Sequence, residues 1–433
     1  MTVTLDILEV GARGDGIADV EGQRYFVPYT LPGETVEAEP RDRRGEGIAA
    51  DLIEVLAPSR HREAPPCAHF TVCGGCALQH WRHDAYTAWK VDLIARALAQ
   101  HGVETPRFEP ALVGVPGERR RADFVLRRQG RRVQAGFHER ASPRIVDVGN
   151  CVVIRPTLNA LLEPLRATLA TVLPEGAAAD AVVNETDSGL DLLLRPHKRL
   201  DLSLERREAL VALAEWADLA RLSWGDRNSA EPVVVRRTPV LFFGEARIEP
   251  PPAVFLQATK RAEQAMRAAV AAWTDGAARL VDLFAGLGAL SFGRTGRLTF
   301  LESDKPAVAA SEQAARRLGD ARASVERRDL FRNALTGKEL DGFDAILLDP
   351  PRAGAAAQAA EIARSKVPRV VYASCDPGSF ARDARALQDG GYRLEKLLPI
   401  DQFLWSSHVE LIALFARAPL RSGKNAKSNS DKH

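Results

Sequence analysis

The sequence predicts a three-part α/β chain: a small N-terminal β-barrel, a central α+β domain and a C-terminal domain with a doubly wound, mostly parallel sheet. Two observations support this fold class. About five short β-type runs fall within the first 57 residues, and six apolar strand-like runs alternate with alanine-rich helix-like runs after residue 250. The first pattern is typical of a small closed barrel, and the second of a parallel sheet covered by helices.

Composition agrees with a globular chain of several domains. At roughly 150 residues per domain, a length of 433 residues suggests about three domains. Lys and Arg (59) nearly balance Asp and Glu (57), which excludes a polybasic or polyacidic tail protein. No apolar run approaches the ~18 residues of a membrane span, and the first ten residues lack the apolar core of a signal peptide. We therefore expect a cytoplasmic protein without a membrane partner.

Residues 1–57 are predicted to form the barrel. Glycines and a Pro32-Gly33 turn separate its β-type runs. The runs are Asp6–Val10, Ile17–Val20, Arg24–Val27, Thr35–Glu39 and Ile48–Leu56. Prolines at positions 58, 65 and 66 then break the pattern, so we place the end of the barrel near residue 57.

Residues 58–250 form the predicted central domain. Its expected elements are a helix over 84–101 and strands near 124–128, 133–137, 190–194 and 233–235. Between residues 118 and 132, seven arginines accompany two acidic residues, a local charge of +5. We interpret this segment as a strand with basic flanks that contacts nucleic-acid phosphates; a solvated charged face is the alternative.

Cysteines are concentrated at the start of the central domain. Cys67, Cys73 and Cys76 form a C-x5-C-x2-C motif, and Cys151 follows 75 residues later. A cytosolic chain with five cysteines is not expected to form a disulfide framework. Four thiolates can instead ligate a [4Fe–4S] cluster or a zinc ion, and spacing alone does not decide between them. Buried free thiols are the remaining alternative.

Residues 251–418 form the predicted doubly wound domain. Its expected strands are Leu280–Phe284, Leu298–Glu302, Ala345–Leu348, Arg369–Ala373, Arg393–Pro399 and Val409–Phe415. Only about 13 residues separate Gly288 from Glu302, so we expect a helix of one or two turns between the first two strands. Residues 421–433 hold no large apolar side chain, and 419–433 is predicted to be a disordered tail.

A nucleotide-cofactor site is predicted where the first of these strands runs into a glycine-rich turn. Asp282, Gly286 and Gly288 fit the D-x-F-x-G-x-G form typical of S-adenosylmethionine methyltransferases. Such a turn lets the backbone approach a cofactor at the carboxyl edge of the sheet. Glu302 ends the next strand, where an acid can bind both ribose hydroxyls, and Asp329 lies where an acid could meet an adenine amine.

Three later segments place a reactive group at the end or start of a buried strand. Asp349 precedes a Pro-Pro turn, Cys375 ends the following strand, and Glu410 follows His408 by two positions. These groups fit methylation of the C5 carbon of uracil. A thiolate that adds to C6 would make C5 nucleophilic toward a sulfonium methyl, and a carboxylate would then remove the C5 proton. A small core cysteine and an ordinary polar strand start are the alternatives.

With these motifs the chain resembles the bacterial RNA uracil-C5 methyltransferases that carry an N-terminal TRAM domain and an iron–sulfur cluster. The resemblance covers residues 1–418. It rests on C-x5-C-G-G-C, the F-L-Q at Phe255–Gln257, D-L-F-A-G-L-G, L-D-P-P-R-A-G, S-C-D-P and H-V-E. It implies a Rossmann-like methyltransferase domain and an OB-like TRAM barrel that binds RNA.

The resemblance also implies a role for particular residues. Cys375 would be the nucleophile and Glu410 the base. The [4Fe–4S] cluster would be held by Cys67, Cys73, Cys76 and Cys151. S-adenosylmethionine would contact Gln257, Phe284, Glu302, Asp329 and Asp349.

The expected partner is RNA with a flipped target uridine, because a stacked base cannot reach a thiol inside a crevice. The combination of barrel and cluster resembles enzymes of 23S rRNA more than those of tRNA, and a monomer is expected.

Three other functions remain open. An amino-group methyltransferase would use the D-P-P turn at Asp349 and would need neither Cys375 nor Glu410. A non-catalytic RNA-binding or chaperone protein would use the barrel and the basic segment without any cofactor. Finally, the cluster could be redox-active, although we favour a structural or RNA-positioning role.

Overall fold

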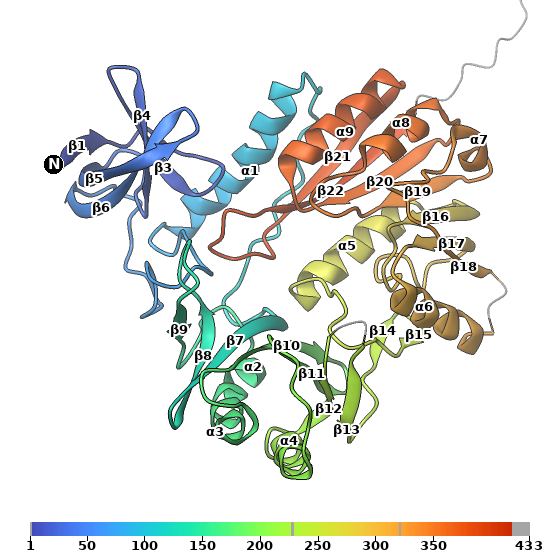
Figure 1. Cartoon of the computed structure of the whole chain (residues 1–433). Coiled ribbons are helices and arrows are strands. Elements are labelled where there is room, and N and C mark those ends of the chain that lie inside the picture. The colour runs from blue at the N-terminus through green and yellow to red at the C-terminus, as the bar shows by residue number, and fades with distance from the viewer. Residues whose placement is uncertain (1, 227–228, 320–321, 418–433) are drawn as a thin grey trace, which may run out of the picture.

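The computed structural model describes residues 2–226, 229–319 and 322–417 and contains three large sheets (Figure 1). The predicted tail, 419–433, lies outside the described residues. Each sheet belongs to one of the three regions expected from the sequence, and the predicted α/β fold class is confirmed. Among the described helices, none is long and apolar enough to cross a bilayer.

The N-terminal region is a β domain of six strands. They are β1 (Val3–Asp6), β2 (Glu9–Val10), β3 (Asp15–Val20), β4 (Gln23–Pro28), β5 (Thr35–Arg44) and β6 (Gly47–Ala57), in the order β1-β5-β6-β4-β3-β2. The expected run Asp6–Val10 is divided between β1 and β2, which lie at opposite ends of that order. Alternate side chains such as Val36 and Ala38 are buried in a small apolar core, as the period of a strand requires.

Helix α1 (His83–Gln100) connects the N-terminal and C-terminal regions, and its predicted bounds are correct to within one residue. The Trp89 indole donates to the Val10 carbonyl oxygen of β2 at 2.9 Å. On the same helix, Ile94 and Leu98 join a core of the C-terminal region. Figure 1 accordingly shows α1 between the β domain and α9 (Pro377–Asp389). The helix therefore holds these two regions in a fixed relation.

The central region is a seven-stranded sheet with helices on one face (Figure 1). In the order of the sheet, its strands are β13 (Glu231–Val235), β12 (Leu219–Trp224), β11 (Gly189–Pro196), β10 (Ala178–Thr186), β7 (Arg121–Gln129), β8 (Arg132–His138) and β9 (Ile145–Asp147). Its helices are α2 (Pro156–Ala160), α3 (Leu162–Val172) and α4 (Leu204–Trp216). Side chains such as Phe124 and Leu165 form the core between sheet and helices.

The C-terminal region is a doubly wound sheet with helices on both faces. In the order of the sheet, its strands are β18 (Ala323–Arg327), β17 (Arg297–Glu302), β16 (Arg279–Leu283), β19 (Ala345–Leu348), β20 (Arg369–Ser374), β22 (Glu410–Arg417) and β21 (Tyr392–Ile400). All neighbours pair in parallel except β22, which is antiparallel to both β20 and β21. The edge strand β18 was missed in the sequence because its A-S-V-E-R run is not apolar.

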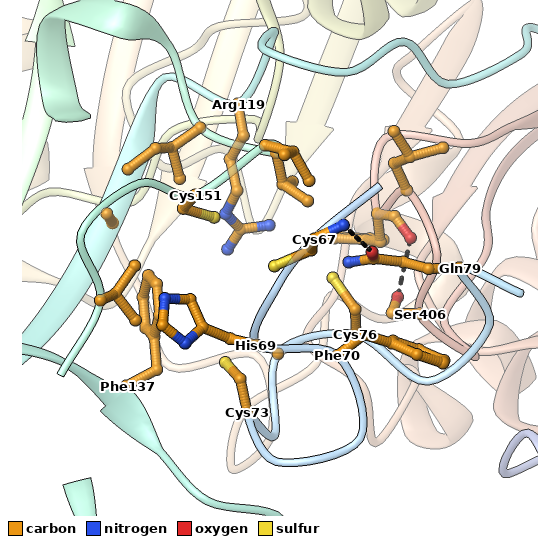
Figure 2. Close-up of a pocket in the computed structure, with 18 of the residues that line it drawn as sticks. Cys67, His69, Phe70, Cys73, Cys76, Gln79, Arg119, Phe137, Cys151 and Ser406 are labelled. Atoms are coloured by element: carbon orange, nitrogen blue, oxygen red, sulfur yellow. Dashed lines mark hydrogen bonds between the residues drawn. The ribbon is translucent and has the colours of Figure 1, made fainter. Parts of the chain in front are cut away.

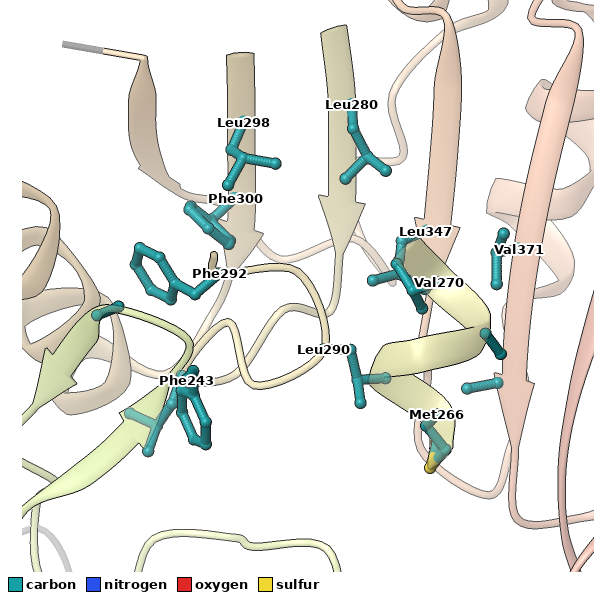
Figure 3. Close-up of a cluster of buried hydrophobic side chains, with 14 of the residues drawn as sticks. Phe243, Met266, Val270, Leu280, Leu290, Phe292, Leu298, Phe300, Leu347 and Val371 are labelled. Atoms are coloured by element: carbon teal, nitrogen blue, oxygen red, sulfur yellow. The ribbon is translucent and has the colours of Figure 1, made fainter. Parts of the chain in front are cut away.

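Two groups of helices cover the two faces of this sheet. Helices α5 (Lys260–Trp273) and α6 (Lys305–Arg317) contribute to one apolar core. Helices α1, α7 (Gly337–Leu340), α8 (Ala356–Arg364) and α9 contribute to the other. Figure 3 shows the first core, in which Val270 of α5 lies beside Leu347 of the sheet, and Met266 lies further along the helix.

The prediction of a short helix between β16 and β17 is wrong, because that connection consists of turns and bends. A hairpin, β14 (Leu241–Phe243) with β15 (Ala246–Ile248), packs in its place and joins the same core. Phe243 of the hairpin lies beside Phe292 in Figure 3, and the ring of Phe292 lies 4.6 Å from that of Phe300. Gly293, with a φ of +88°, would bring a Cβ within 3.1 Å of the hairpin backbone at Gly244. This close approach favours turns over a helix.

Candidate active site

The candidate site lies at one edge of the C-terminal sheet. The parallel strands β16, β19 and β20 end at this edge, and the antiparallel strand β22 begins there. Asp349 therefore follows β19, Cys375 follows β20, and Glu410 is the first residue of β22. The strand order reverses between β17 and β19, on either side of β16, and ligands of open α/β sheets bind at such a switch point. The sheet thus brings together three reactive groups predicted from separate segments.

Two buried glutamines, Gln402 and Gln257, connect the carboxylates of Glu410 and Asp349 through hydrogen bonds. The Gln402 amide nitrogen donates to Glu410 Oε2 at 2.7 Å and to Gln257 Oε1 at 2.8 Å. The Gln257 amide nitrogen donates in turn to Asp349 Oδ2 over 3.4 Å. Gln257, which was predicted as a cofactor contact, is therefore hydrogen-bonded to Asp349 on one side and to Gln402 on the other.

Burial and mutual repulsion hold both carboxyl groups closer to the neutral form than usual. Glu410 is only 3% exposed. Burial, and the nearby Asp349, raise the pKa of Glu410, while the hydrogen bond from Gln402 lowers it. Burial likewise raises the pKa of Asp349. A carboxylate with a raised pKa is a stronger base, so Glu410 is suited to remove a proton near neutral pH.

Cys375 is half-buried and faces both acids. Burial, followed by the charges of Glu410 and Asp349, raises the pKa of its thiol to about 11, while the Arg352 guanidinium lowers it. Arg352 Nη2 lies 3.1 Å from His408 Nε2, which holds the guanidinium near the start of β22. Arg352 is therefore the cation available to favour a thiolate at Cys375.

Replacing Arg352 with Ala is expected to slow alkylation of Cys375 by iodoacetamide roughly three- to tenfold at neutral pH, because loss of the cation raises the pKa of the thiol further. The rate is measured by peptide mass spectrometry across a range of pH. Arg352→Lys keeps a positive charge and is expected to react at close to the wild-type rate. Equal rates in wild-type protein and R352A at every pH would contradict the assignment.

The glycine-rich turn after β16 leaves open space beside a fixed carboxylate. Gly286 has a φ of +55°, and a Cβ built there meets no atom within 4 Å. Its N–H donates to Glu302 Oε2 at 2.9 Å, and Glu302 Oε1 accepts from Ser303 and Asp304 N–H at 2.7 and 2.8 Å. Three backbone donors thus orient Glu302 at the end of β17, next to space that a bound nucleoside could occupy.

Phe331 contacts both Phe284 and Asp329. The ring of Phe284 lies 5.2 Å from that of Phe331, which is 55% exposed. Asp329 is exposed, and its Oδ1 accepts the N–H of Phe331 at 3.0 Å. Sequence analysis missed Phe331, although an aromatic residue two positions after a candidate adenine-binding acid was an available signal.

The four predicted metal-ligand cysteines surround one cavity of about 330 Å³ (Figure 2). Figure 2 shows Cys67, Cys73, Cys76 and Cys151 directed toward this space from two separate segments, with Arg119 between them. Burial raises the pKa of Cys73 and Cys151, and raises that of Cys76 to about 12. Among the described residues, no three acidic, thiol or imidazole groups converge closely enough to hold a single metal ion.

The basic segment serves more than one purpose. Arg120 is buried, pairs with Glu263 at 2.5 Å and donates to the Gln257 carbonyl oxygen at 3.1 Å, so it helps to hold the backbone at Gln257 in place. Arg128 donates to the Leu173 carbonyl oxygen at 2.6 Å and is structural. The exposed arginines of this segment are Arg127, Arg131 and Arg132.

Gln402 is the main site residue that sequence analysis missed. It stands two positions beyond the end of β21, at the same edge of the sheet as Asp349 and Cys375. A polar side chain just beyond a half-buried strand was the available signal. No motif marked it, because its two partners lie far away in the sequence or across an antiparallel turn.

Comparison with known sequences gives a consistent set of relatives. A family model described as tRNA (uracil-5-)-methyltransferase matches residues 313–418. A Brucella suis protein named as an uncharacterized RNA methyltransferase is 41% identical over 419 residues, or 96% of this chain and 98% of that protein. The 23S rRNA (uracil(1939)-C(5))-methyltransferase of Yersinia enterocolitica is 31% identical over 432 residues, or 96% of each chain.

One solved structure matches the whole chain in fold. The Pyrococcus abyssi tRNA (uracil-54, C5)-methyltransferase in complex with S-adenosyl-L-homocysteine aligns with a TM-score of 0.73 at 21% identity, over 96% of this chain and 99% of that chain. At this level of identity the match shows a shared fold, and it does not bear on the RNA substrate.

Proposed function

The chain belongs to the family of RNA (uracil-5-)-methyltransferases, and on this premise we propose that it transfers a methyl group from S-adenosylmethionine to C5 of a uridine in 23S rRNA. The main support for this reaction is that Cys375, Glu410 and Asp349 lie at one edge of the sheet, beside the open turn at Gly286. The 31% identical Yersinia relative supports the rRNA substrate.

In this mechanism Cys375 acts as the nucleophile. The thiol first loses its proton, a step that Arg352 favours. The thiolate then adds to C6 of the uracil, and the electron pair of the C5–C6 double bond forms an enolate whose C5 is nucleophilic. S-adenosylmethionine supplies an electrophilic methyl group, which C5 takes as the S–CH3 bond breaks, and the donor leaves as S-adenosylhomocysteine.

Glu410 completes the reaction as the base. Its carboxylate removes the C5 proton, the C5–C6 double bond forms again, and the C6–S bond breaks to release the Cys375 thiolate. The thiolate regains a proton, and Glu410 later loses its own to solvent. The raised pKa of Glu410 increases its affinity for that proton.

The methyl donor is proposed to bind across the switch point of the sheet. Glu302 would accept hydrogen bonds from the ribose hydroxyls, and Asp329 would accept one from the adenine amine. Phe284 and Phe331 would contact the adenine ring. Asp349 and Gln257 would hold the amino-acid part of the donor, because they lie between the turn and Cys375.

We also propose that Cys67, Cys73, Cys76 and Cys151 hold a [4Fe–4S] cluster. A cluster of several atoms needs thiolates spread around a cavity, whereas a single zinc ion needs four sulfurs about 2.3 Å from one point. The four cysteines line one cavity, together with residues such as Arg119 and His408, and in the described part of the chain they do not converge on a single point, which supports the cluster over zinc. Its role in our proposal is structural, because the cysteines connect two distant segments.

Replacing Cys151 with Ser is expected to remove most of the iron from anaerobically purified protein. The wild-type chain should hold about four irons and four acid-labile sulfides. Cys375→Ser is the matched control and should keep the full iron content, since Cys375 does not line the cavity. One zinc and no iron per wild-type chain would contradict the cluster.

The RNA would present a flipped uridine from a loop or bulge to Cys375. The exposed residues Arg127, Arg131 and Arg132 are proposed to contact its phosphates.

Replacing all three of these arginines with Ala should weaken RNA binding roughly tenfold and lower the slope of log Kd against log salt by about two to three. Arg207→Ala, at an exposed position on α4, is the control and should leave the slope unchanged. An unchanged slope in the triple variant would exclude this contact.

Deletion of the gene tests the reaction and the substrate together. Nucleoside mass spectrometry would measure 5-methyluridine in separated large rRNA, small rRNA and tRNA. Loss confined to large rRNA supports the proposal. Loss confined to tRNA would favour the second candidate, a tRNA uridine methyltransferase, for which the description of the matching family model is the specific observation. We further propose that the protein acts as a cytoplasmic monomer.

A further inference from the structure

We propose that Gln402 is a positioning residue, which favours the ionised form of Glu410, directs this base at the C5 proton and links it to the methyl-donor site through Gln257. The inference rests on the proposed function, in which Glu410 is the base. It adds a residue that lies outside every motif of the chain.

The orientation of the Gln402 amide is fixed by three partners. Its Oε1 accepts the backbone N–H of Ala258 at 2.8 Å, and its amide nitrogen donates to Gln257 and to Glu410. A reversed amide would place its nitrogen against another N–H donor, so only this orientation satisfies all three contacts. Both amide hydrogens are therefore directed at acceptors, one of them the Glu410 carboxylate.

The backbone that carries Gln402 is also held in place. Asp401 N–H donates to the Leu112 carbonyl oxygen at 2.8 Å. The buried Lys90 of α1 pairs with Asp401 Oδ1 at 2.5 Å and donates to the Phe403 carbonyl oxygen at 3.0 Å. The residues on both sides of Gln402 are thus anchored to a helix outside the sheet, as a preorganised positioning group requires.

The surroundings of Glu410 explain why such a donor is needed. The titratable groups that face it are Asp349 after β19 and Cys375 after β20. The Arg120 cation is paired with Glu263 and donates to the Gln257 carbonyl oxygen instead of to Glu410. Gln402 is consequently the donor that stabilises the charge of a base which burial and Asp349 both favour in its neutral form.

Gln257 extends the same arrangement toward the methyl donor. Because Gln257 Oε1 accepts from Gln402, its amide nitrogen is left to face Asp349 Oδ2. One amide N–H is thereby supplied to each of the two buried carboxylates. A change at Gln402 is expected to alter both.

Gln402→Met tests the inference, since methionine has a similar length and no donor. Single turnovers on RNA that contains [5-³H]uridine are followed from about pH 6 to pH 9 by tritium release and by the covalent protein–RNA adduct on denaturing gels. In Q402M the acid limb of tritium release should move up by about one pH unit or more. The adduct should persist at low pH, and the rate should approach wild type at high pH.

Two further variants exclude a merely structural effect. Gln402→Glu keeps the shape and an acceptor for Ala258 but lacks both donors, so it should show a loss at least as large. Gln358→Met is the matched control: Gln358 is similarly buried and, among the described residues, its side chain hydrogen-bonds to the backbone of Leu335 alone, so this variant should keep the wild-type pH profile. A Q402M profile that superimposes on wild type, or that falls equally at every pH, would overturn the inference.

Glu410→Gln separates this inference from the proposed function. If E410Q blocks tritium release while Q402M and Q402E keep the wild-type profile, Glu410 remains the base and only the role of Gln402 is wrong. If E410Q releases tritium at the wild-type rate, the assignment of the base and the inference both fail.

Discussion

Cys375→Ala is expected to reduce methylation of RNA by at least about a thousandfold, because no other nucleophile would activate C5 of the uracil. The half-buried thiol at the end of β20 lies close enough to Glu410 and Asp349 for their charges to raise its pKa. Binding of S-adenosylmethionine should persist, since the proposed donor site around Gly286 and Glu302 does not include Cys375.

The measurement pairs turnover with a covalent trap. Wild-type protein should form a gel-stable adduct with RNA that contains 5-fluorouridine, because fluorine at C5 prevents the final proton removal. C375A should form none, while isothermal titration should show unchanged donor affinity. Cys375→Ser should behave in the same way, because a serine hydroxyl is a much weaker nucleophile than a thiolate.

The result also decides between the reaction classes that the sequence leaves open. An amino-group methyltransferase built on the Asp349 turn would keep its activity in C375A. A non-catalytic RNA-binding protein would bind no donor in any variant. Full activity of C375A on a purified RNA substrate would therefore overturn the proposed mechanism and favour methylation of an amine.

Residues at strand ends could be predicted from the sequence because short apolar runs specify both the strand and its carboxyl edge. Asp349, Cys375 and Glu410 each stand directly beside such a run, and parallel strands place their ends together. The strands of this sheet were accordingly predicted to within about two residues, apart from the polar edge strand β18.

Features that depend on packing between distant segments could not be predicted. The hydrogen bond between Gln402 and Gln257 joins residues 145 positions apart, and neither glutamine side chain shows its partner locally. The same holds for the β14–β15 hairpin, which packs where a crossover helix was expected. Likewise, a basic run gives no sign that Arg120 is buried in an ion pair while Arg127 is exposed.

Glu410→Gln is expected to stop the reaction after methyl transfer rather than before it. Cys375 can still add to C6 and C5 can still take the methyl group, but an amide cannot remove the C5 proton. The methylated RNA should therefore remain attached to the protein, and release of 5-methyluridine should fall by roughly a hundredfold to ten-thousandfold.

The measurement is a denaturing gel with ordinary uridine RNA and donor labelled in its methyl group. E410Q should give a labelled band at the mass of the protein–RNA adduct, where wild-type protein gives labelled free RNA. Release of free product by E410Q at the wild-type rate would contradict the assignment.

The pH dependence of wild-type turnover follows from the same carboxylate. Burial and Asp349 raise the pKa of Glu410, so its basic form is lost as the pH falls through that raised value. Below it, the methylated adduct should accumulate in wild-type protein, and a shift to higher pH should release it. E410Q should show no such release at any pH. One titratable group would then account for both the position of the stalled step and its dependence on pH, which a general loss of folding at low pH would not do.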